Sequence, residues 1–495
     1  MKSFCLTVAG IKNALDDAHL LKFMKPPSDA AVFKKVVTDL GNVEPGCLFL
    51  AYRGVHFDAH QNIEAAIKGG AAFVVMDDPA FQDGCTVPYA LVTNSRAAGT
   101  HLMAEGYGHP EKQMTFIGIT GTNGKTSVAF IVKELLRLKG QPSLLLGTLG
   151  TFMGDVHVTG AHTTPDPPQL FLDLASAVER GIRYCVMEVS SHALSQHKIG
   201  PIRFFGGAFT SFSRDHLDFH GSMEEYFEAK LSLARLMKNQ SVFLVSSSLE
   251  EVRTKAILSA QPDAIVYGQQ SSKVANLGIR YDAREGPVGS ILRVQQGQGV
   301  REGQIKFLED FASANFVAAL ALAEWALGEA IAPELWSQVR PVPGRLEPVD
   351  LAGTVIVDYA HTPDALEKTL MIVKPRVQGR LWVVFGCGGD RDRGKRALMG
   401  EVAATHGDRV VVTSDNPRSE NPKAIMDDIK KGLDGFGGVT YIEDRREAIR
   451  HAVTQKDGKD WVVIAGKGHE DYQTIQGQDF PFDDREIARE FLTKD

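Results

Sequence analysis

The stretch FIGITGTNGKTSVAF, residues 116–130, is typical of an apolar strand, a glycine-rich turn and the start of a helix. Successive backbone N–H groups at such a turn, followed by a helix N-terminus, form an anion site. Lys125 can reach the terminal phosphates of a nucleotide, and the Thr126 hydroxyl can ligate Mg²⁺. The pattern differs from G-x-x-x-x-G-K-[ST] because Ile119 replaces the first glycine and Gly121 supplies one two residues later. The stretch therefore predicts a phosphate-binding loop of unusual form, with a purely structural glycine turn as the alternative.

The size and composition of the chain set the broad class. Its 495 residues are too many for one hydrophobic core and predict about three domains. The net charge of -7 argues against nucleic-acid binding as the main activity. Five scattered cysteines without metal-ligand spacing predict a reducing compartment and no disulfide framework. We find neither a good signal peptide nor about 18 consecutive apolar residues, so we expect a cytoplasmic protein without a membrane span.

Strand and helix patterns alternate in three blocks, residues 1–110, 111–340 and 341–495. Such alternation implies parallel sheets with βαβ crossovers, so the sequence predicts an α/β fold. Ligands in these sheets bind at the carboxyl ends of the strands, where the polar and glycine-rich clusters of this chain fall. In the last block the expected strands lie in the segments TVIVDYA, LWVVFGCGG, RVVVTSD and WVVIAGKG.

Acidic and histidine side chains of the second block suggest metal binding. Glu188 ends a buried strand, where its carboxylate suits a second ligand for the Mg²⁺ of a nucleotide, although a solvated strand end is the alternative. The segment SRDHLDFHG brings Asp215, His216, Asp218 and His220 into seven residues. This density favours a metal role and surface or capping roles about equally.

One lysine is predicted on an apolar helix face. The helix begins with a capping-box signature, Ser222 with Glu225. Its spacing places Lys230 on the same face as Tyr226 and Phe227. Spacing alone favours a lysine that extends its amine to solvent along this face. The alternative is a desolvated lysine whose lowered pKa makes it a nucleophile or a modification site.

Two loops of the third block could bind charged ligands. The segment GCGGDRDRGKR, residues 386–396, follows a strand and could bind phosphate or carboxylate, or be a solvated basic loop. In TSDNPRSENP, Asp415 and Asn416 precede Pro417 and predict a turn. Arg418 then projects from a rigid support, which suits a carboxylate ligand, with an ordinary surface arginine as the alternative.

Together these segments resemble the Mur ligases, the ATP-dependent amino-acid ligases of peptidoglycan synthesis. The resemblance spans about residues 110–485 and is strongest to the member that adds the third amino acid. It is carried, in this order, by GTNGKTS (121–127), MEVSSHAL, SRDHLD, PGRLE, DYAHTPDALE, GCGGDRDRGKR, DNPR and GKGHE.

The resemblance implies a cytoplasmic, monomeric, ADP-forming ligase that uses ATP and Mg²⁺. It would join meso-2,6-diaminopimelate to the γ-carboxylate of D-glutamate in UDP-N-acetylmuramoyl-L-alanyl-D-glutamate through an acyl phosphate. Residues 1–110 would bind the UDP substrate, residues 111–340 would form the central ATP-binding sheet with the phosphate loop, and residues 341–495 would form a Rossmann-like domain that binds the amino acid.

The resemblance also assigns roles to residues. Lys125, Glu188, His216 and Lys230 would be catalytic; Thr126 and Glu188 would hold one Mg²⁺, and His216 and Lys230, carbamylated to N6-carboxylysine, a second. A carbamate turns a buried lysine into a carboxylate-like ligand, which reverses the preference from spacing. The implied ATP contacts are Gly121, Thr122, Asn123, Gly124, Lys125, Thr126, Ser127, Asn315, Arg345, Asp358 and His361. The implied contacts to the UDP substrate are Thr163, Thr164, Ser190, Gln196 and Lys198, the last where arginine is usual. The implied amino-acid contacts are Arg391, Asp415, Asn416, Pro417, Arg418, Gly466 and Glu470.

Arg418 bears on which amino acid is added. Members that add diaminopimelate carry this arginine, and its guanidinium can grip the second carboxylate, which L-lysine lacks. A lysine-adding or folylpolyglutamate-type ligase is therefore disfavoured, and a nucleotide switch is disfavoured because no N-K-x-D segment occurs. The chain departs from the family at Leu40 and Gly41, which replace Ser and Arg of an Asp-Ser-Arg signature, and at Ser211 and Ala312, where Asn is common. The resemblance therefore leaves the uridine contacts of the first block unassigned.

Overall fold

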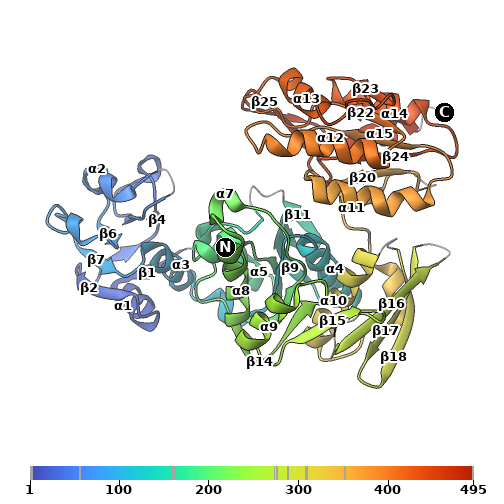
Figure 1. Cartoon of the computed structure of the whole chain (residues 1–495). Helices are drawn as coiled ribbons and strands as arrows, with labels where there is room; N and C mark the ends of the chain where they lie inside the picture. The colour runs from blue at the N-terminus through green and yellow to red at the C-terminus, as the bar shows by residue number, and fades with distance from the viewer. Residues whose placement is uncertain are drawn as a thin grey trace. The chain divides into compact units, whose positions relative to one another are not determined.

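The computed structural model describes residues 4–54, 57–158, 163–272, 274, 277–286, 289–306, 310–350 and 353–492 (Figure 1). It divides into two compact units. The first comprises Met1–Lys306 and Asp310–Val339, and the second comprises Phe307–Glu309 and Arg340–Asp495. Among the described residues, no helix is long and apolar enough to cross a membrane.

The N-terminal part of the first unit contains a small sheet with helices. Its elements are β1 (Leu6–Thr7), α1 (Val8–Asp17), β2 (Leu21–Lys25), β3 (Val32–Phe33), β4 (Val36–Val37), β5 (Leu48–Leu50), α2 (Ile63–Lys68), β6 (Phe73–Met76), β7 (Tyr89–Val92) and α3 (Ser95–Gly106). The sheet order is β2-β7-β6-β5-β4, with β2 antiparallel and the other pairs parallel. All residues of β5 and β6 are buried, as expected for parallel strands covered on both faces.

The rest of the first unit is built on a sheet of eleven described strands. The strands are β8 (Thr115–Thr120), β9 (Ser143–Gly147), β10 (Gly150–Met153), β11 (Val156–Val158), β12 (Tyr184–Glu188), β13 (Phe204–Phe209), β14 (Met237–Ser246), β15 (Ile265–Gln269), β16 (Ile279–Glu285), β17 (Ser290–Gln296) and β18 (Gly299–Ile305). Their order is β11-β10-β9-β12-β8-β13-β14-β15-β16-β17-β18. The strands from β9 to β16 pair in parallel, whereas antiparallel strands extend both ends of the sheet. The predicted parallel sheet is therefore the centre of a larger mixed one.

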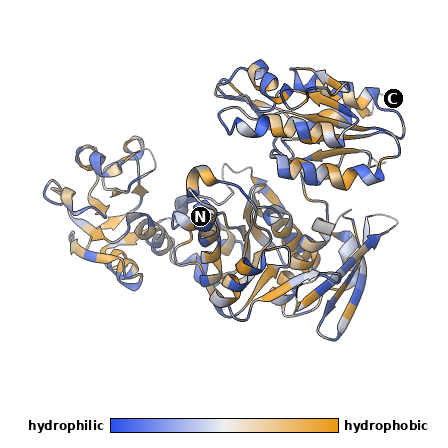
Figure 2. Ribbon diagram, viewed as in Figure 1, coloured by the Kyte–Doolittle hydropathy of each residue, from blue (hydrophilic) through white to orange (hydrophobic). Residues whose placement is uncertain are grey.

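The helices of this region are α4 (Lys125–Leu138), α5 (Pro167–Glu179), α6 (Ser191–Ser195), α7 (Leu217–His220), α8 (Met223–Arg235), α9 (Glu251–Ala260) and α10 (Asp310–Leu327). Helix α4 follows β8 directly and packs against α10. Helix α8 begins with the predicted cap, since the side chain of Ser222 accepts a hydrogen bond from the N–H of Glu225. Figure 2 shows hydrophobic residues concentrated along the strands that these helices cover.

The second unit is a six-stranded sheet between two helical layers. Its elements are β19 (Glu347–Pro348), β20 (Val355–Asp358), α11 (Pro363–Val373), β21 (Leu381–Phe385), α12 (Gly394–His406), β22 (Arg409–Val412), α13 (Pro422–Lys430), β23 (Val439–Tyr441), α14 (Arg445–Gln455), β24 (Trp461–Ala465), β25 (Tyr472–Ile475), β26 (Gln478–Pro481) and α15 (Asp484–Leu492). The sheet order is β19-β20-β24-β21-β22-β23, and only β19 is antiparallel. Hairpin β25–β26 stands outside the sheet.

Alternating side chains of these strands form two separate cores. Ile356 packs with residues of α11, α12 and α13, whereas Val355 and Val357 pack with residues of α14 and α15. This period of two places helices on both faces of a mainly parallel sheet. Both large sheets thus confirm the predicted α/β class, and their loops at the strand carboxyl ends carry the candidate sites.

Candidate functional site

The predicted phosphate loop joins β8 to α4. Gly121 and Gly124 have positive φ angles of 144° and 88°, a backbone conformation that favours glycine. A Cβ atom at Gly121 would lie 2.1 Å from Oγ1 of Thr210, so no larger residue fits. The glycine that distinguishes this loop from the commoner pattern is therefore required by close packing against the residues after β13.

Backbone and hydroxyl groups after β13 hold the loop in place. The N–H of Thr122 donates to the carbonyl of Ser211 (2.9 Å), and the N–H of Asn123 donates to the Ser211 hydroxyl (2.8 Å). The Thr210 hydroxyl donates to the carbonyl of Asn123. Ser211 thus anchors the loop from the position where the family often has asparagine. Asn315, a predicted nucleotide contact on α10, also reaches the loop, because its Oδ1 would lie 2.7 Å from a Cβ at Gly124.

Two lysine amines converge on the loop. Lys125 Nζ donates to the carbonyls of Gly121 and Thr122, both at 2.9 Å. Lys230 Nζ donates to the same Gly121 carbonyl at 2.8 Å and lies 4.6 Å from the centroid of the Tyr226 ring. Burial, followed by repulsion from Lys125, lowers the pKa of Lys230 well below its ordinary value. Only 1% of Lys230 is exposed, so the prediction from spacing, an amine extended to solvent, is wrong. The helix face is enclosed by the phosphate loop, which places the amine inside.

Glu188 meets the loop at the carboxyl end of β12. It is 1% exposed, and its Oε2 accepts hydrogen bonds from the hydroxyls of Thr126 (3.0 Å) and Thr148 (3.1 Å). Its Oε1 accepts from the backbone N–H of Thr148 at 2.8 Å. The oxygen of Thr126 and the carboxylate of Glu188 are therefore adjacent, as a shared hard cation would require.

The residues predicted to contact the UDP substrate adjoin Glu188. The Thr164 hydroxyl donates to the carbonyl of Glu188 at 2.8 Å, and the Thr163 hydroxyl lies 3.2 Å from that of Thr148. Ser190 caps α6, since its hydroxyl accepts from the N–H of Ala193. Gln196 follows the last turn of α6, and Lys198 pairs with Asp166, with 2.6 Å between Nζ and Oδ1. The structure thus places Thr163, Thr164 and Ser190 beside Glu188, the candidate metal ligand. Lys198 forms an ion pair with Asp166.

Histidine rings gather beside α7 and α8. His216 is about half exposed, and its ring centroid lies 4.8 Å from that of His192 and 6.1 Å from that of Tyr226. His220 is buried, with Nε2 2.9 Å from the Ser191 hydroxyl. In the described part of the chain, no three or more His, Cys, Asp and Glu side chains form a group that could hold a metal ion. The side chain of Asp218 lies outside the described residues.

In the second unit, the loops after β21, β22 and β24 bring the predicted amino-acid contacts together. Asn416 Nδ2 donates to Oε2 of Glu470 at 2.8 Å. Arg418 Nη1 donates to the carbonyl of Gly389 at 2.9 Å, and the side chains of Arg391 and Arg418 both border Gly388. Pro417 connects Asn416 to Arg418 in the same loop.

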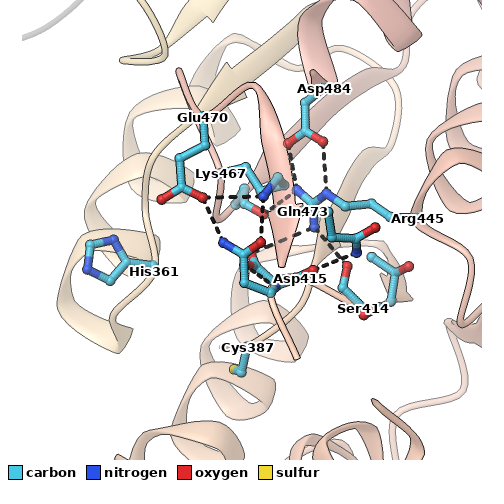
Figure 3. A network of polar contacts seen from close by, with 12 residues as sticks. His361, Cys387, Ser414, Asp415, Arg445, Lys467, Glu470, Gln473 and Asp484 are labelled. Atoms are coloured by element: carbon cyan, nitrogen blue, oxygen red, sulfur yellow. Dashed lines mark hydrogen bonds and ion pairs between the residues drawn. The ribbon is translucent and has the colours of Figure 1, made fainter. Parts of the chain in front are cut away.

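Asp415 is buried within this cluster, close to Arg445 (Figure 3). A Cβ at Gly466 would lie 2.4 Å from Oδ2 of Asp415, so the glycine allows the carboxylate to approach. The Arg445 guanidinium forms a bidentate pair with Asp484 at 2.8 and 2.6 Å and donates to the carbonyl of Ala465 at 3.0 Å. Arg445 therefore ties α15 to the end of β24, next to the predicted contacts.

The predicted nucleotide contacts of the second unit have structural partners. Asp358 is buried and accepts hydrogen bonds from the N–H groups of Leu346 (2.8 Å) and Ala360 (2.9 Å) and from the Thr369 hydroxyl. Arg345 places its guanidinium 4.6 Å from the centroid of the Tyr359 ring. His361 is exposed, and its Nδ1 lies 2.8 Å from the carbonyl of Tyr359. Asp358 thus fixes the turn that carries Arg345.

Comparisons with known proteins identify the family of the chain. A family model described as Mur ligase middle domain matches residues 119–323, and one described as Mur ligase, glutamate ligase domain matches residues 344–468. A UDP-N-acetylmuramoyl-L-alanyl-D-glutamate–2,6-diaminopimelate ligase of Caldanaerobacter subterraneus is 39% identical over 465 residues, which cover 93% of this chain and 94% of that protein. The chain belongs to the Mur ligase family.

Other comparisons place this Mur ligase within the family. A relative of the same name from Gloeobacter violaceus is 41% identical over 92% of this chain and 93% of its own length. A solved structure of a UDP-N-acetylmuramoyl-L-alanyl-D-glutamate–2,6-diaminopimelate ligase is 30% identical, covers 99% of both chains and has a TM-score of 0.68. A folylpolyglutamate synthase of Mycobacterium tuberculosis has a TM-score of 0.60 at 20% identity, which shows a shared fold alone.

Sequence reasoning missed four polar residues of this Mur ligase. Thr148 binds Glu188, and its position just after strand β9, a neighbour of β12, was a usable signal. His192 lies in the segment SSHAL, but nothing in the sequence placed it against His216. Arg445 and Lys467 are charged residues at 1% and 0% exposure, and only the folded arrangement shows them to be interior.

Proposed function

We propose that this Mur ligase joins meso-2,6-diaminopimelate to the D-glutamate γ-carboxylate of UDP-N-acetylmuramoyl-L-alanyl-D-glutamate and converts ATP to ADP and phosphate. The observation that carries the choice of amino acid is the position of Arg418 on the loop that also carries Asp415 and Asn416, with Glu470 bonded to Asn416. A guanidinium beside carboxylates complements the carboxylate and ammonium of an α-amino acid end. Diaminopimelate has two such ends, so one can be held while the other reacts, whereas L-lysine has one.

The phosphate loop would bind ATP and promote the first step. The γ-carboxylate of the dipeptide attacks the γ-phosphorus of ATP, the bond to the bridging oxygen breaks, and ADP leaves with an acyl phosphate remaining. Lys125 and the loop N–H groups hold the phosphates in line for this attack and oppose their charge. Oxygen-18 placed in the γ-carboxylate should then appear in the released phosphate.

The amine of diaminopimelate would complete the reaction. Its α-amino nitrogen at the L-centre attacks the acyl carbon, the carbon–oxygen bond to phosphate breaks, and an amide forms with loss of a proton. The neighbouring residues Asp415, Asn416 and Glu470 would orient the other end of the molecule, so that only one amine reaches the acyl carbon.

Mg²⁺ is the cofactor that we propose, and the residues present fit it. Thr126 and Glu188 offer adjacent oxygens, and His216 and Lys230 would serve a second ion. Lys230 is suited to carbamylation because burial lowers the pKa of its amine, which favours the neutral form that attacks CO₂ with loss of a proton. When bound, Mg²⁺ would neutralise charge on the phosphates during transfer.

We further propose that the three domains divide at about residues 110 and 340, and that the protein acts as a cytoplasmic monomer. Residues 1–110 would bind the UDP portion, residues 111–340 ATP, and residues 341–495 the amino acid. The remaining assigned contacts keep the roles given above, with Thr163, Thr164, Ser190, Gln196 and Lys198 on the UDP substrate.

Phosphate release tests the proposal. Purified enzyme with Mg·ATP and the UDP-muramoyl-dipeptide should release phosphate only after diaminopimelate is added. A Lys125→Ala variant should lose this activity, because the phosphates lose their cationic partner. Equal turnover with L-lysine would contradict the assigned amino acid.

A further inference from the structure

Lys467 occupies a turn that forces its side chain inward. It lies between Gly466 and Gly468, which have positive φ angles of 120° and 56°. A Cβ at Gly468 would lie 2.6 Å from the Cβ of Tyr359, so this backbone path is open only to glycine. Lys467 is 0% exposed as a result, and its amine cannot reach solvent.

The buried amine contacts two of the proposed amino-acid ligands. Lys467 Nζ donates to Oδ1 of Asn416 at 3.0 Å and lies 3.3 Å from Oε2 of Glu470 (Figure 3). Asn416 Nδ2 donates to that same Oε2, and the N–H of Thr474 donates to Asn416 Oδ1 at 3.0 Å. The amine, the amide and the carboxylate therefore form a closed triangle, in which the amide has only one orientation that satisfies every partner.

Burial of Lys467 removes its amine from water, so the amine loses its hydration. A buried ammonium is costly unless hydrogen bonds and an opposite charge compensate it. Lys467 finds these partners on Asn416 and Glu470, both placed above in the amino-acid pocket. A hydrophobic residue of similar length would fill the same space without the charge. The contacts with Asn416 and Glu470 therefore explain why this residue is a lysine.

We propose that Lys467 is a positioning residue for the incoming amino acid, which sets the orientation of Asn416 and the charge and position of Glu470. The inference rests on the proposed function, because Asn416 and Glu470 are ligands for an amino acid only if that function holds. Lys467 acts through these two side chains and need not touch the substrate.

The electrostatics of Glu470 supply a readout. Burial raises the pKa of Glu470, and the charge of Lys467 opposes this rise. Removing the charge should raise the pKa further, so that Glu470 becomes protonated at higher pH. The other titratable or charged groups that interact electrostatically with Glu470 are Asp415, Arg445, Tyr359 and Tyr472.

Steady-state kinetics across pH test the proposal with two variants of the full-length enzyme. Lys467→Met removes the charge and the donors, and Lys467→Gln keeps a donor without the charge. Lys467→Met should raise KM for diaminopimelate roughly ten- to a hundredfold, since hydrogen bonds to charged groups are lost. KM for ATP should stay within about twofold. The acidic limb of kcat/KM for diaminopimelate should move to higher pH in both variants.

Leu370→Ala is the matched control, because Leu370 is fully buried on α11 of the same unit and lies in its apolar core. It should lower the melting temperature without moving the acidic limb. A folded Lys467 variant with unchanged KM and pH profile would overturn the proposal, as would equal increases in KM for ATP and diaminopimelate. If Lys467→Met does not fold, the kinetics of Lys467→Gln test the proposal. Insolubility of both variants would overturn it, because Lys467 would then have only a structural role. Failure of the proposed function is distinguishable, since the wild type would then not use diaminopimelate.

Discussion

Replacing Arg418 should weaken the use of diaminopimelate specifically. Arg418 lies on the loop after β22, partly buried, with one Nη1 hydrogen bond to the carbonyl of Gly389. That bond orients the guanidinium and leaves the rest of its fork for a carboxylate. Arg418→Ala would remove a bidentate, charge-assisted contact, and Arg418→Lys would keep the charge but only a single point of attachment.

The size of the effect follows from the bonds that are lost. A hydrogen bond to a charged group contributes about 1.5–3 kcal/mol. Because Arg418 is only partly buried, we take about 2–3 kcal/mol for the pair of bonds, which corresponds to a loss of roughly 30- to 150-fold in kcat/KM. Arg418→Lys should lose about tenfold, since one bond survives.

Initial rates of phosphate release against diaminopimelate concentration measure this loss. KM for ATP should not change, because Arg418 belongs to the second unit, whereas the phosphate loop belongs to the first. Arg450→Ala is the matched control: Arg450 is an exposed arginine on α14 of the same unit, paired with Glu447. Retention of kcat/KM within about threefold in Arg418→Ala would refute the assigned role and would revive a lysine-adding or folylpolyglutamate-type activity.

Three further predictions concern other buried charges. Lys230→Met should lower kcat at least about a hundredfold, and wild-type turnover should fall when CO₂ is stripped and return with bicarbonate; turnover indifferent to CO₂ would contradict carbamylation. Burial alone would lower the pKa of His60, but hydrogen bonds to two aspartates raise this pKa above 6.5. The protonated ring therefore stabilises the fold below pH 6.5, and this contribution is lost as pH rises through the folded-state pKa. The gap in melting temperature between wild type and His60→Gln should therefore narrow as pH rises, and a gap that widens would be inconsistent with this sign. Arg445→Met should destabilise the second unit by about 3–5 kcal/mol in urea unfolding, because Asp484 is left buried and unpaired, and adding Asp484→Leu should recover part of the loss.

Much of the fold could be predicted because its signals are local. The apolar segments around β20, β21, β22 and β24 form strands as expected, since parallel strands are covered on both faces and consist of apolar runs. The antiparallel extension from β16 to β18 was not predicted. Strand pairing at a sheet edge depends on partners distant in sequence, and these strands carry mixed polar and apolar residues.

The candidate site was predictable where one segment carries the chemistry. Glu188 ends a strand, and the phosphate loop and the loop of Arg418 each follow one; within each sheet, parallel strands end at the same edge. Lys230 shows the limit of this reasoning, because helical spacing gives its face but not what covers it. Its enclosure depends on the carbonyl of Gly121, which is 109 residues away in sequence. Lys467 and Arg445 could not be found for the same reason, since Lys467 contacts Asn416, which is 51 residues away in sequence, and Arg445 contacts Asp484, which is 39 residues away.

The central claim is tested most directly by a competition between amino acids. The enzyme should be given Mg·ATP, UDP-N-acetylmuramoyl-L-alanyl-D-glutamate and an equimolar mixture of meso-diaminopimelate, L-lysine and L-glutamate, and the nucleotide product should be weighed by mass spectrometry. We predict a single tripeptide product whose mass increase corresponds to diaminopimelate less water. A lysine or glutamate adduct in comparable yield, or no adduct while ATP is consumed, would contradict the account.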